Sequence, residues 1–138
     1  MAIAPRFAHL YDSDLPADIA VGLVLHLDPP VLESEGGTYT CNPTVRVQDQ
    51  HFFVCIAVNT NTSRWLPLYT EPGEGRTNIA STRKHGHKKW TEGPTYWHKD
   101  QVWEATSHAV YLAAGRAHDK SRKGSRNYID PSALPTSL

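Results

Sequence analysis

The chain has 138 residues, of which 39% are hydrophobic and 20% charged, and its formal net charge is zero. This balance is typical of a globular chain that buries its own core, and it excludes a wholly disordered one. No apolar run approaches the roughly 18–20 residues that a membrane-spanning helix needs, and the start of the chain turns acidic where a secretory signal would turn apolar. We therefore expect a soluble, cytoplasmic protein.

Charge is divided unevenly between the two halves of the chain. Residues 1–74 carry three basic and nine acidic side chains, a formal charge of −6, whereas residues 75–138 carry eleven basic and five acidic ones, a charge of +6. Such asymmetry predicts a polyanionic partner for the basic half. Two other interpretations stay open: the halves attract each other within the fold, or the basic residues simply lie in solvent.

The first half of the chain contains the clearest strand patterns. Ile19–Leu27 alternates its side chains between two faces, and Thr38–Val47 is rich in β-formers but interrupted by Pro43, which predicts an edge strand or two short pieces. Phe52–Val58 is apolar on both faces, which is typical of a central, fully buried strand. Trp65–Thr70 follows a turn of Asn and Thr residues, so we expect it to form a hairpin with that central strand.

The second half is more polar and less regular. Residues 76–94 are expected to form a basic surface excursion, and residues 95–103 contain β-rich pieces that are separated by His98, Lys99 and Asp100. A short helix is predicted around residues 107–115: Ser107 is its N-cap, residues 108–114 are helical, and Gly115 ends it. Residues 118–138 have no period, so we expect a flexible basic tail that adds little to stability.

Many short strands, turns rich in glycine and proline, and one late helix together predict a mainly β fold. We expect a single small β-barrel domain over residues 1–117, in which residues 1–18 form an arm or loop. A β-sandwich is the alternative architecture.

The sequence carries no motif of a hydrolase, a nucleotide-binding loop or a zinc site. His85 and His87 have a spacing that can hold a metal ion, but the basic residues around them would repel a cation. We therefore expect neither a metal nor another cofactor. Cys41 and Cys55 are expected to be free thiols, with Cys55 buried in its apolar strand.

The basic excursion and the aromatic residues after it form a candidate nucleic-acid surface. Lysine and arginine neutralise phosphates, and interleaved aromatic rings can stack on unpaired bases. We predict that the 76–103 segment faces the nucleic acid, with Thr70 and His51 at its base. The predicted contact residues are Arg76, Arg83, Lys84, Lys88, Lys89 and Trp90.

Three segments in this order resemble the PemK/MazF family of toxins: HFFVCIAV, then RWLPLYTEP, then TYWHKDQVWEATSHAV. The resemblance implies an SH3-like β-barrel, a homodimer, and metal-independent cleavage of single-stranded RNA in a toxin–antitoxin system. By position, Thr70 matches the hydroxyl residue of the family. His51 stands where the family has an arginine before the central strand, and Arg46 is the nearest guanidinium. The late strand of the family is matched by Asp100, Gln101 and Val102.

Cleavage of RNA needs a base for the 2′-hydroxyl, an acid for the leaving 5′-oxygen and a cation for the developing charge. His51 titrates in the range suited to an acid or a base. Arg46 or Arg76 is expected to hold the phosphate, and Thr70 to donate a hydrogen bond to it. The predicted catalytic residues are therefore Thr70, His51 and Arg46.

Two non-enzymatic functions remain as alternatives. An acidic stretch favours a phage- or plasmid-type inhibitor or adaptor that binds a basic partner surface. Its residues are Asp12, Asp14, Asp18, Asp28, Glu33 and Glu35. The other alternative is a ligand-binding β-sandwich that uses exposed tryptophans. The expected partners are thus single-stranded RNA or another nucleic acid, together with an antitoxin or an inhibited target protein, and no membrane.

Overall fold

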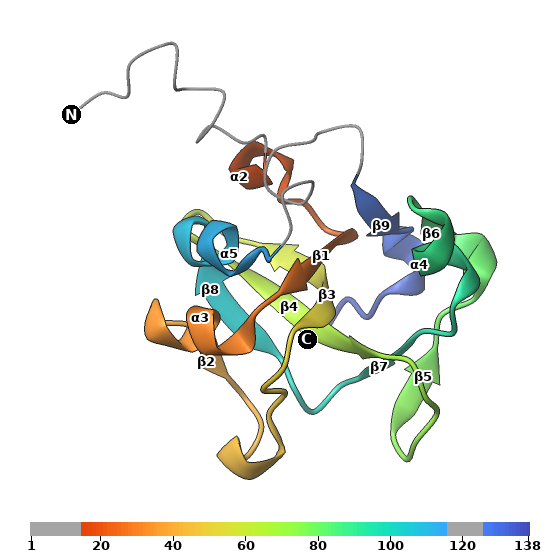
Figure 1. The fold of residues 1–138 in the computed structure, drawn as a ribbon, viewed down its shortest axis with the longest axis horizontal. Helices are drawn as coiled ribbons and strands as arrows, with labels where there is room; N and C mark the ends of the chain where they lie inside the picture. The colour runs from red at the N-terminus through yellow and green to blue at the C-terminus, as the bar shows by residue number, and fades with distance from the viewer. Residues whose placement is uncertain (1–14, 116–125) are drawn as a thin grey trace.

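Nine antiparallel strands pair into one sheet in the computed structural model, which describes residues 15–115 and 126–138 (Figure 1). The strands are β1 Leu23–Leu27, β2 Thr38–Tyr39, β3 His51–Val58, β4 Thr62–Tyr69, β5 Arg76–Asn78, β6 Lys84–His85, β7 Tyr96–His98, β8 Trp103–Thr106 and β9 Asn127–Ile129. The helices are α2 Leu15–Asp18, α3 Pro29–Ser34, α4 Lys88–Glu92 and α5 Ser107–Ala113, and short 3-10 turns are η1 Pro43–Val45, η2 Ser81–Arg83 and η4 Pro131–Ala133. The predicted mainly β fold is confirmed.

Strand β4 connects two parts of the sheet. The main path runs β2–β8–β4–β3–β1–β9–β6, and β7 and β5 branch from it at β4. The first half of β4 pairs with β8, whereas Leu68 and Tyr69 at its end pair with β7. Pro67 lies between these halves and forms the last register pair with β3, opposite Phe53. A proline has no N–H to donate, so the ladder to β3 ends where the strand turns toward β7.

The central strand β3 is buried on both faces, as its sequence predicts. Phe53 and Cys55 belong to one apolar cluster, with Trp65, Trp103 and the leucines of β1. Val54 and Ile56 belong to the other, with Leu66, Leu68, Ile79 and Ile129. Full burial of side chains of this size stabilises a fold by roughly 1.5–3 kcal/mol each. Both cysteines are free thiols, and Cys55 is buried.

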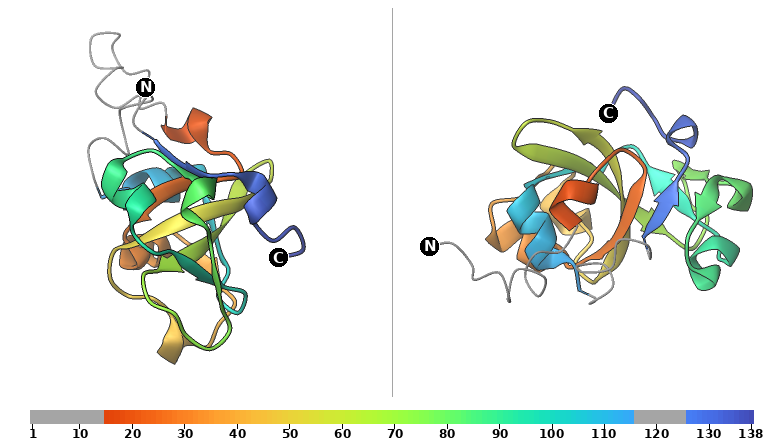
Figure 2. Two further views of the ribbon diagram at one scale, coloured as in Figure 1. Left: turned by 90° about the vertical axis from the view of Figure 1, so that its right-hand side faces the viewer. Right: turned by 90° about the horizontal axis from the view of Figure 1, so that it is seen from above.

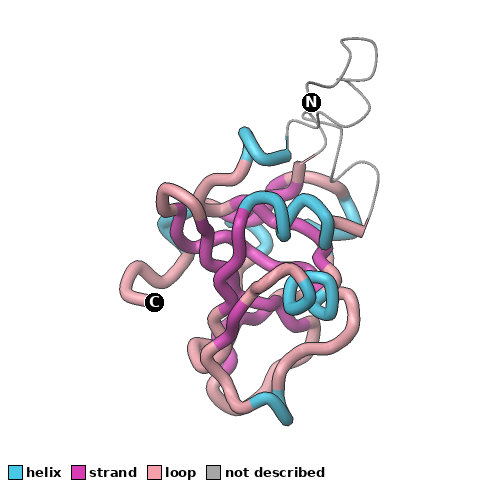
Figure 3. The backbone as a smooth tube through the Cα atoms, turned by 90° about the vertical axis from the view of Figure 1, so that its left-hand side faces the viewer, coloured by secondary structure: helices cyan, strands magenta, loops and turns pink. Residues whose placement is uncertain are grey.

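The helices cover the two ends of the bent sheet unequally. Helix α5 contacts α2, α3 and β8, and these helices lie together on one side (Figures 1 and 3). Helix α4 contacts β6 and η2 at the other end, beside β5 and β9 (Figures 1 and 2).

More helices form than the single one expected. Helix α3 begins after Asp28 with prolines at its first two positions. Proline is tolerated there because the first N–H groups of a helix have no carbonyl partner within the helix, so no hydrogen bond is lost. In the sequence, the same prolines indicate only the end of a strand. Helix α5 starts one residue earlier than predicted, because Thr106 and not Ser107 is the N-cap: the Thr106 hydroxyl accepts from the Ala109 N–H at 3.1 Å.

The prediction of a flexible tail over 118–138 is wrong for its second half. Residues 127–129 form β9, which pairs with β1 on one side and β6 on the other. Ile129 is fully buried in the second apolar cluster. A strand of three residues is too short to show an alternating pattern in the sequence. Its burial comes from pairing with strands that are distant in the sequence, so it could not be predicted locally. Residues 118–125 lie outside the described residues, as do residues 1–14 of the arm or loop predicted over 1–18. The last four residues of that segment form helix α2, with Leu15 buried, so the prediction of an arm or loop is wrong there.

In the part of the chain that the structure describes, no helix combines the length and apolar character that crossing a bilayer requires.

Candidate functional site

The end of β4 opens into a cleft of about 510 Å³, here called the Tyr69 cleft. Its walls come from strands β4, β5 and β7, from the β4–β5 loop, from the residues between β7 and β8, and from the connection between β2 and β3. The lining residues are Cys41, Val45, Tyr69, Pro72, Gly73, Glu74, Arg76, His98, Asp100 and Gln101. The divergence of β4 from β3 beyond Pro67 therefore places a pocket at the branch of the sheet.

A cation–π pair stands in the Tyr69 cleft. The Arg76 guanidinium carbon lies 3.9 Å from the centroid of the Tyr69 ring. One Arg76 amino group donates to the Glu71 carbonyl at 3.0 Å, which fixes the side chain over the ring. Burial raises the pKa of the Tyr69 hydroxyl, and the charge of Arg76 opposes this rise only in part. Tyr69 therefore stays a protonated phenol at neutral pH.

The buried side chain of Gln101 positions Tyr69 through a hydrogen bond to its hydroxyl. Its amide nitrogen donates to the Tyr69 hydroxyl at 3.3 Å and to the Val45 carbonyl at 3.4 Å. Its amide oxygen accepts from the Val47 N–H at 2.9 Å and from the Trp103 indole N–H at 2.8 Å. Because a buried amide needs partners for both ends, Gln101 ties the η1 loop, β8 and the cleft together.

His98 lies on β7 opposite Arg76 of β5 in the strand register. Its Nδ1 accepts the backbone N–H of Asp100 at 3.0 Å. A neutral imidazole that accepts at Nδ1 carries its proton at Nε2. That edge of the ring lies against Gly75, where φ is +76° and a Cβ would come within 2.5 Å of Nε2. Gly75 is thus required both for the turn and for the place of the ring.

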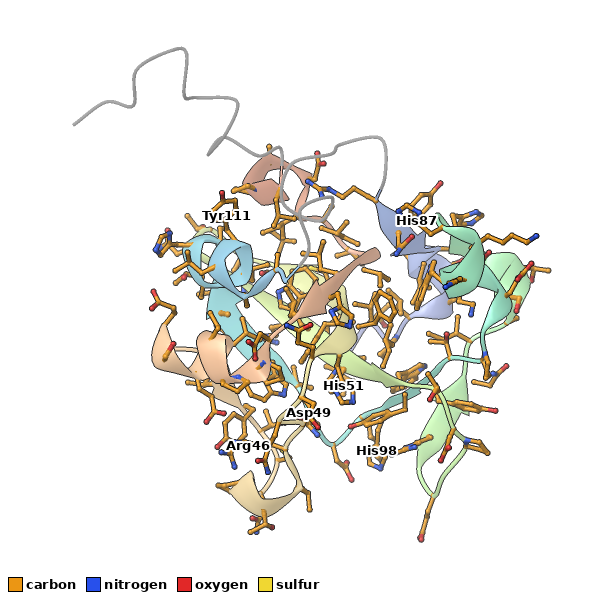
Figure 4. The ribbon with its side chains drawn as sticks, viewed as in Figure 1. Arg46, Asp49, His51, His87, His98 and Tyr111 are labelled. Atoms are coloured by element: carbon orange, nitrogen blue, oxygen red, sulfur yellow. The ribbon has the colours of Figure 1, made fainter. Side chains whose placement is uncertain are left out.

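His51 begins β3 and is not one of the residues that line the cleft, but its ring contacts the ring of Tyr69, which does line it. Its Nδ1 lies 2.8 Å from the Asp49 carbonyl. A carbonyl only accepts, so Nδ1 carries the proton and the neutral ring presents a lone pair at Nε2. The ring meets the Tyr69 ring edge to face, with centroids 6.0 Å apart. Figure 4 shows His51, Asp49 and His98 on the lower half of the molecule.

The structure brings only His51, of the three predicted catalytic residues, against the Tyr69 ring. Arg46 instead forms an ion pair with Glu33 at 2.9 Å, which raises the pKa of its guanidinium, and donates to the Pro43 carbonyl. Thr70 is exposed and lines a separate hollow of about 70 Å³ beside Phe52 and Trp90. Catalytic roles for Arg46 and Thr70 remain predictions.

The expected exposure of two predicted nucleic-acid contacts is wrong. Lys84 is only 4% exposed, because its ammonium donates to the Trp90 and Gly93 carbonyls and to the Thr95 hydroxyl. This burial lowers the pKa of Lys84. Trp90 is 6% exposed and belongs to the second apolar cluster. Both residues hold helix α4 in place and leave no surface for a phosphate or a base.

The other predicted contacts lie at the surface. Arg83, Lys88 and Lys89 are exposed, and Arg76 is partly buried in the cleft. Lys88 lies 3.8 Å from Glu92 one helical turn away, a pair that contributes little in solvent. The basic segment therefore has a buried part, Lys84 and Trp90, and an exposed edge, Arg83, Lys88 and Lys89.

A second, larger groove of about 890 Å³ continues from the Tyr69 cleft, since Cys41, Val45 and Asp100 line both. Polar residues of β2 and the charged residues Arg64, Lys99 and Glu104 form its sides. Burial raises the pKa of the Cys41 thiol, so it is not a thiolate nucleophile.

The histidine pair does not act as one unit. His85 Nε2 lies 2.9 Å from an Asp130 carboxylate oxygen, whereas the His87 backbone N–H donates to Asn127. No three side chains of the metal-ligating types gather within the described residues.

The acidic stretch is largely engaged within the chain. Asp18 lies 3.3 Å from Arg126, Glu33 pairs with Arg46, and Glu35 lies 3.9 Å from His108. Asp12 and Asp14 lie outside the described residues. The contacts Asp18–Arg126 and Glu35–His108 join the two halves of the chain, whereas Glu33–Arg46 lies within the first half, so these contacts correspond only in part to the interpretation that the two halves attract each other.

No family model matches the chain, and no curated protein or solved structure is significantly similar to it. The sequence alone does not identify His98 and Tyr69 as members of a site. The segment His98–Asp100 is interpreted there as a break between β pieces, although a histidine followed at two residues by an aspartate is a local hydrogen-bonding signal.

Proposed function

We propose that the Tyr69 cleft binds single-stranded RNA and cleaves it without a metal, through attack of the 2′-hydroxyl on the neighbouring phosphodiester. This is the activity that the resemblance to the PemK/MazF toxins implies. The proposal includes the family's context: a cytoplasmic homodimer that is controlled by an antitoxin partner. Its main support is a pair of histidines, His98 in the wall of the cleft and His51 against the Tyr69 ring, which backbone hydrogen bonds hold in opposite tautomers.

The two tautomers give the histidines different roles. The lone pair at His51 Nε2 accepts a proton, because Nδ1 already donates to the Asp49 carbonyl. The N–H at His98 Nε2 donates a hydrogen bond, because Nδ1 already accepts from Asp100. A neutral imidazole is a poor proton donor, so His98 binds a phosphate oxygen and does not protonate the leaving group.

Arg76 supplies the positive charge that the reaction needs. A guanidinium has five N–H donors and pairs well with two phosphate oxygens. The bond to the Glu71 carbonyl uses one donor, and the Tyr69 ring fixes the plane of the group. The negative charge that develops on the phosphate oxygens is then stabilised by groups that are already in place. Such preorganised electrostatic stabilisation is the largest contribution to rate enhancement in many enzymes.

In the proposed reaction, protons move between His51, the RNA, Tyr69 and water, and both side chains return to their starting state. His51 takes the proton of the 2′-hydroxyl as that oxygen bonds to phosphorus. The bond from phosphorus to the 5′-oxygen breaks, and the Tyr69 phenol protonates the leaving oxygen. The products are a 2′,3′-cyclic phosphate and a 5′-hydroxyl end, and water returns the proton from the His51 imidazolium to the Tyr69 phenolate.

The test is incubation with mixed single-stranded RNA in EDTA. We expect cleavage with 2′,3′-cyclic phosphate ends, and its loss in His51→Ala. His108→Ala is the matched control, since His108 is an exposed histidine on α5. The absence of cleavage together with the absence of RNA binding at low salt contradicts the proposal. Cleavage that stops in EDTA contradicts the metal-independent reaction.

A further inference from the structure

Strands β6 and β9 bring a histidine and a tyrosine together at the surface. His85 and Tyr128 are direct partners in the strand register. Their rings stack with centroids 4.8 Å apart and an angle of 24° between the planes. The His85 side chain is 40% exposed and Tyr128 is 46% exposed. These two residues are here called the Tyr128 platform.

The platform is held rigidly by its surroundings. His85 Nε2 lies 2.9 Å from Asp130, and the Asp130 backbone N–H donates to the Arg83 carbonyl at 2.9 Å. Beside the rings, the buried Asn127 side chain accepts the His87 N–H at 2.8 Å. Gly86 has φ of +126°, and a Cβ there would clash with the Asn127 side chain. A surface fixed in this way loses little entropy when a ligand binds.

An apolar hollow adjoins the platform. Tyr128 lines a space of about 340 Å³ together with Val21, Leu23 and Pro131. Val21 is exposed at 41%, so the space opens to solvent. The ion pair of Asp18 with Arg126 gives the hollow a polar side. A flat ring with polar edges fits such a space: its face meets Tyr128 and its edge meets the charged pair.

Basic side chains lie beside this surface and along the segment that leads from it to the cleft. Arg83 is 54% exposed on its side chain, with one amino group 3.2 Å from the Ser132 hydroxyl and 3.9 Å from Asp130. Helix α4 carries Lys88 beside β6, and the chain between the two sites runs from Arg76 in the cleft to His85 on the platform. Figure 4 shows His87 at this end of the molecule, away from the labelled residues of the cleft.

We propose that the Tyr128 platform binds an unpaired nucleobase of the RNA strand whose phosphodiester lies in the Tyr69 cleft. This inference rests on the proposed function, because it assigns the same strand to both places. The exposed side chains of Arg83 and Lys88 meet the phosphates between the two places, and Tyr128 stacks on the base. Trp90, which the sequence indicates for this role, is buried, and Tyr128 from the end of the chain takes its place.

The test compares RNA binding by the full chain and by Tyr128→Ala, measured as fluorescence anisotropy of a labelled single-stranded oligonucleotide. Stacking by one aromatic residue has an effect that corresponds to roughly a tenfold change in Kd. We expect this loss of affinity in Tyr128→Ala and wild-type affinity in Tyr128→Phe. For an abasic oligonucleotide, which has no base to stack, we expect the wild type and Tyr128→Ala to bind with equal affinity. Val21→Glu fills the hollow with a charge and is expected to weaken binding without touching the core.

Cleavage of a dinucleotide separates the inference from the proposed function. A dinucleotide occupies the cleft alone, so Tyr128→Ala should cleave it at the wild-type rate. Unchanged affinity of both Tyr128→Ala and Val21→Glu for the long oligonucleotide overturns the platform while the proposed function stands. A wild-type chain that binds no RNA overturns the proposed function and the platform with it.

Discussion

The Tyr69 cleft and the Tyr128 platform each contain a tyrosine at a strand end, but the two rings are covered differently. In the cleft, a guanidinium lies over the Tyr69 ring and occupies the surface on which a base would stack. On the platform, the Tyr128 ring is backed by His85 and remains nearly half exposed. The same residue type thus orients a cation in one place and offers an aromatic surface in the other.

The largest expected effect concerns the cation of the cleft. Arg76→Ala should lower the rate of RNA cleavage by about 100-fold or more, because preorganised charge at a reacting phosphate has effects of this size. The measurement is the single-turnover cleavage rate, with the protein in excess of the RNA and at a concentration above Kd. Arg83→Ala removes an equally basic group at the platform and should leave that rate unchanged. Equal losses in both variants would mean that the two regions do not differ in chemistry.

The second largest effect is expected on stability, from replacing the buried amide side chains of Gln101 at the cleft and Asn127 at the platform. Gln101→Leu leaves the buried Val47 N–H and Trp103 indole N–H without an acceptor, so we expect a loss of about 2–4 kcal/mol in the free energy of unfolding. Asn127→Leu removes the acceptor of the His87 N–H and should cost about 1–2 kcal/mol. Urea denaturation measures both. The reverse order would show that the platform is the more tightly held region.

A third prediction uses the buried ammonium of Lys84. Burial lowers its pKa in the folded state below the ordinary 10.5, so the folded protein binds fewer protons than the unfolded chain between the two values. Stability therefore rises as the pH increases toward 10.5, relative to a variant without the amine. Denaturation of the wild type and Lys84→Met at several pH values tests this. The exposed Lys88→Met should follow the wild type, and parallel curves for Lys84→Met would contradict the prediction.

The smallest expected effect is at the exposed edge of the basic segment. Replacing Lys88 and Lys89 with Ala should leave the fold intact and weaken RNA binding. Each lysine that neutralises a phosphate of a single strand adds about 0.7 to the slope of log K against log salt, so its removal should flatten the slope by that amount. Titrations at several salt concentrations give this slope. An unaltered slope places the phosphates elsewhere on the surface.

Local patterns in the sequence predict the centre of the fold well. Phe53 and Cys55 on one face of β3, and Val54 and Ile56 on the other, follow directly from alternation of apolar residues. The hairpin of β3 with β4 follows from the turn between them. By contrast, β9 is too short to show a period, and its place depends on β1 and β6, which lie more than 40 residues away in the sequence.

The candidate site is less predictable because it depends on which distant residues face each other. Lys84 looks like its exposed neighbours in the sequence, and only the carbonyls around it explain its burial. The titration range of histidine is enough to predict a role for His51. Its tautomer, however, depends on the Asp49 carbonyl, and its neighbour Tyr69 comes from another strand. The pairing of Arg76 with His98 requires the β5–β7 register, which no local pattern contains.

The branch of the sheet at Pro67 also bears on cooperativity. The β5–β7 ladder is joined to the rest of the sheet by the two register pairs of Leu68 and Tyr69, whereas β3 pairs with β1 over its first half and with β4 over most of its length. Segments with few such connections form separate units of local unfolding. Amide hydrogens of residues 76–78 therefore exchange with solvent through openings that leave β3 protected. The same ladder carries Arg76 and His98 in the wall of the cleft, and Ile79 and Trp97 connect it to the second apolar cluster, so we expect its opening to loosen that cluster and to leave the first one closed.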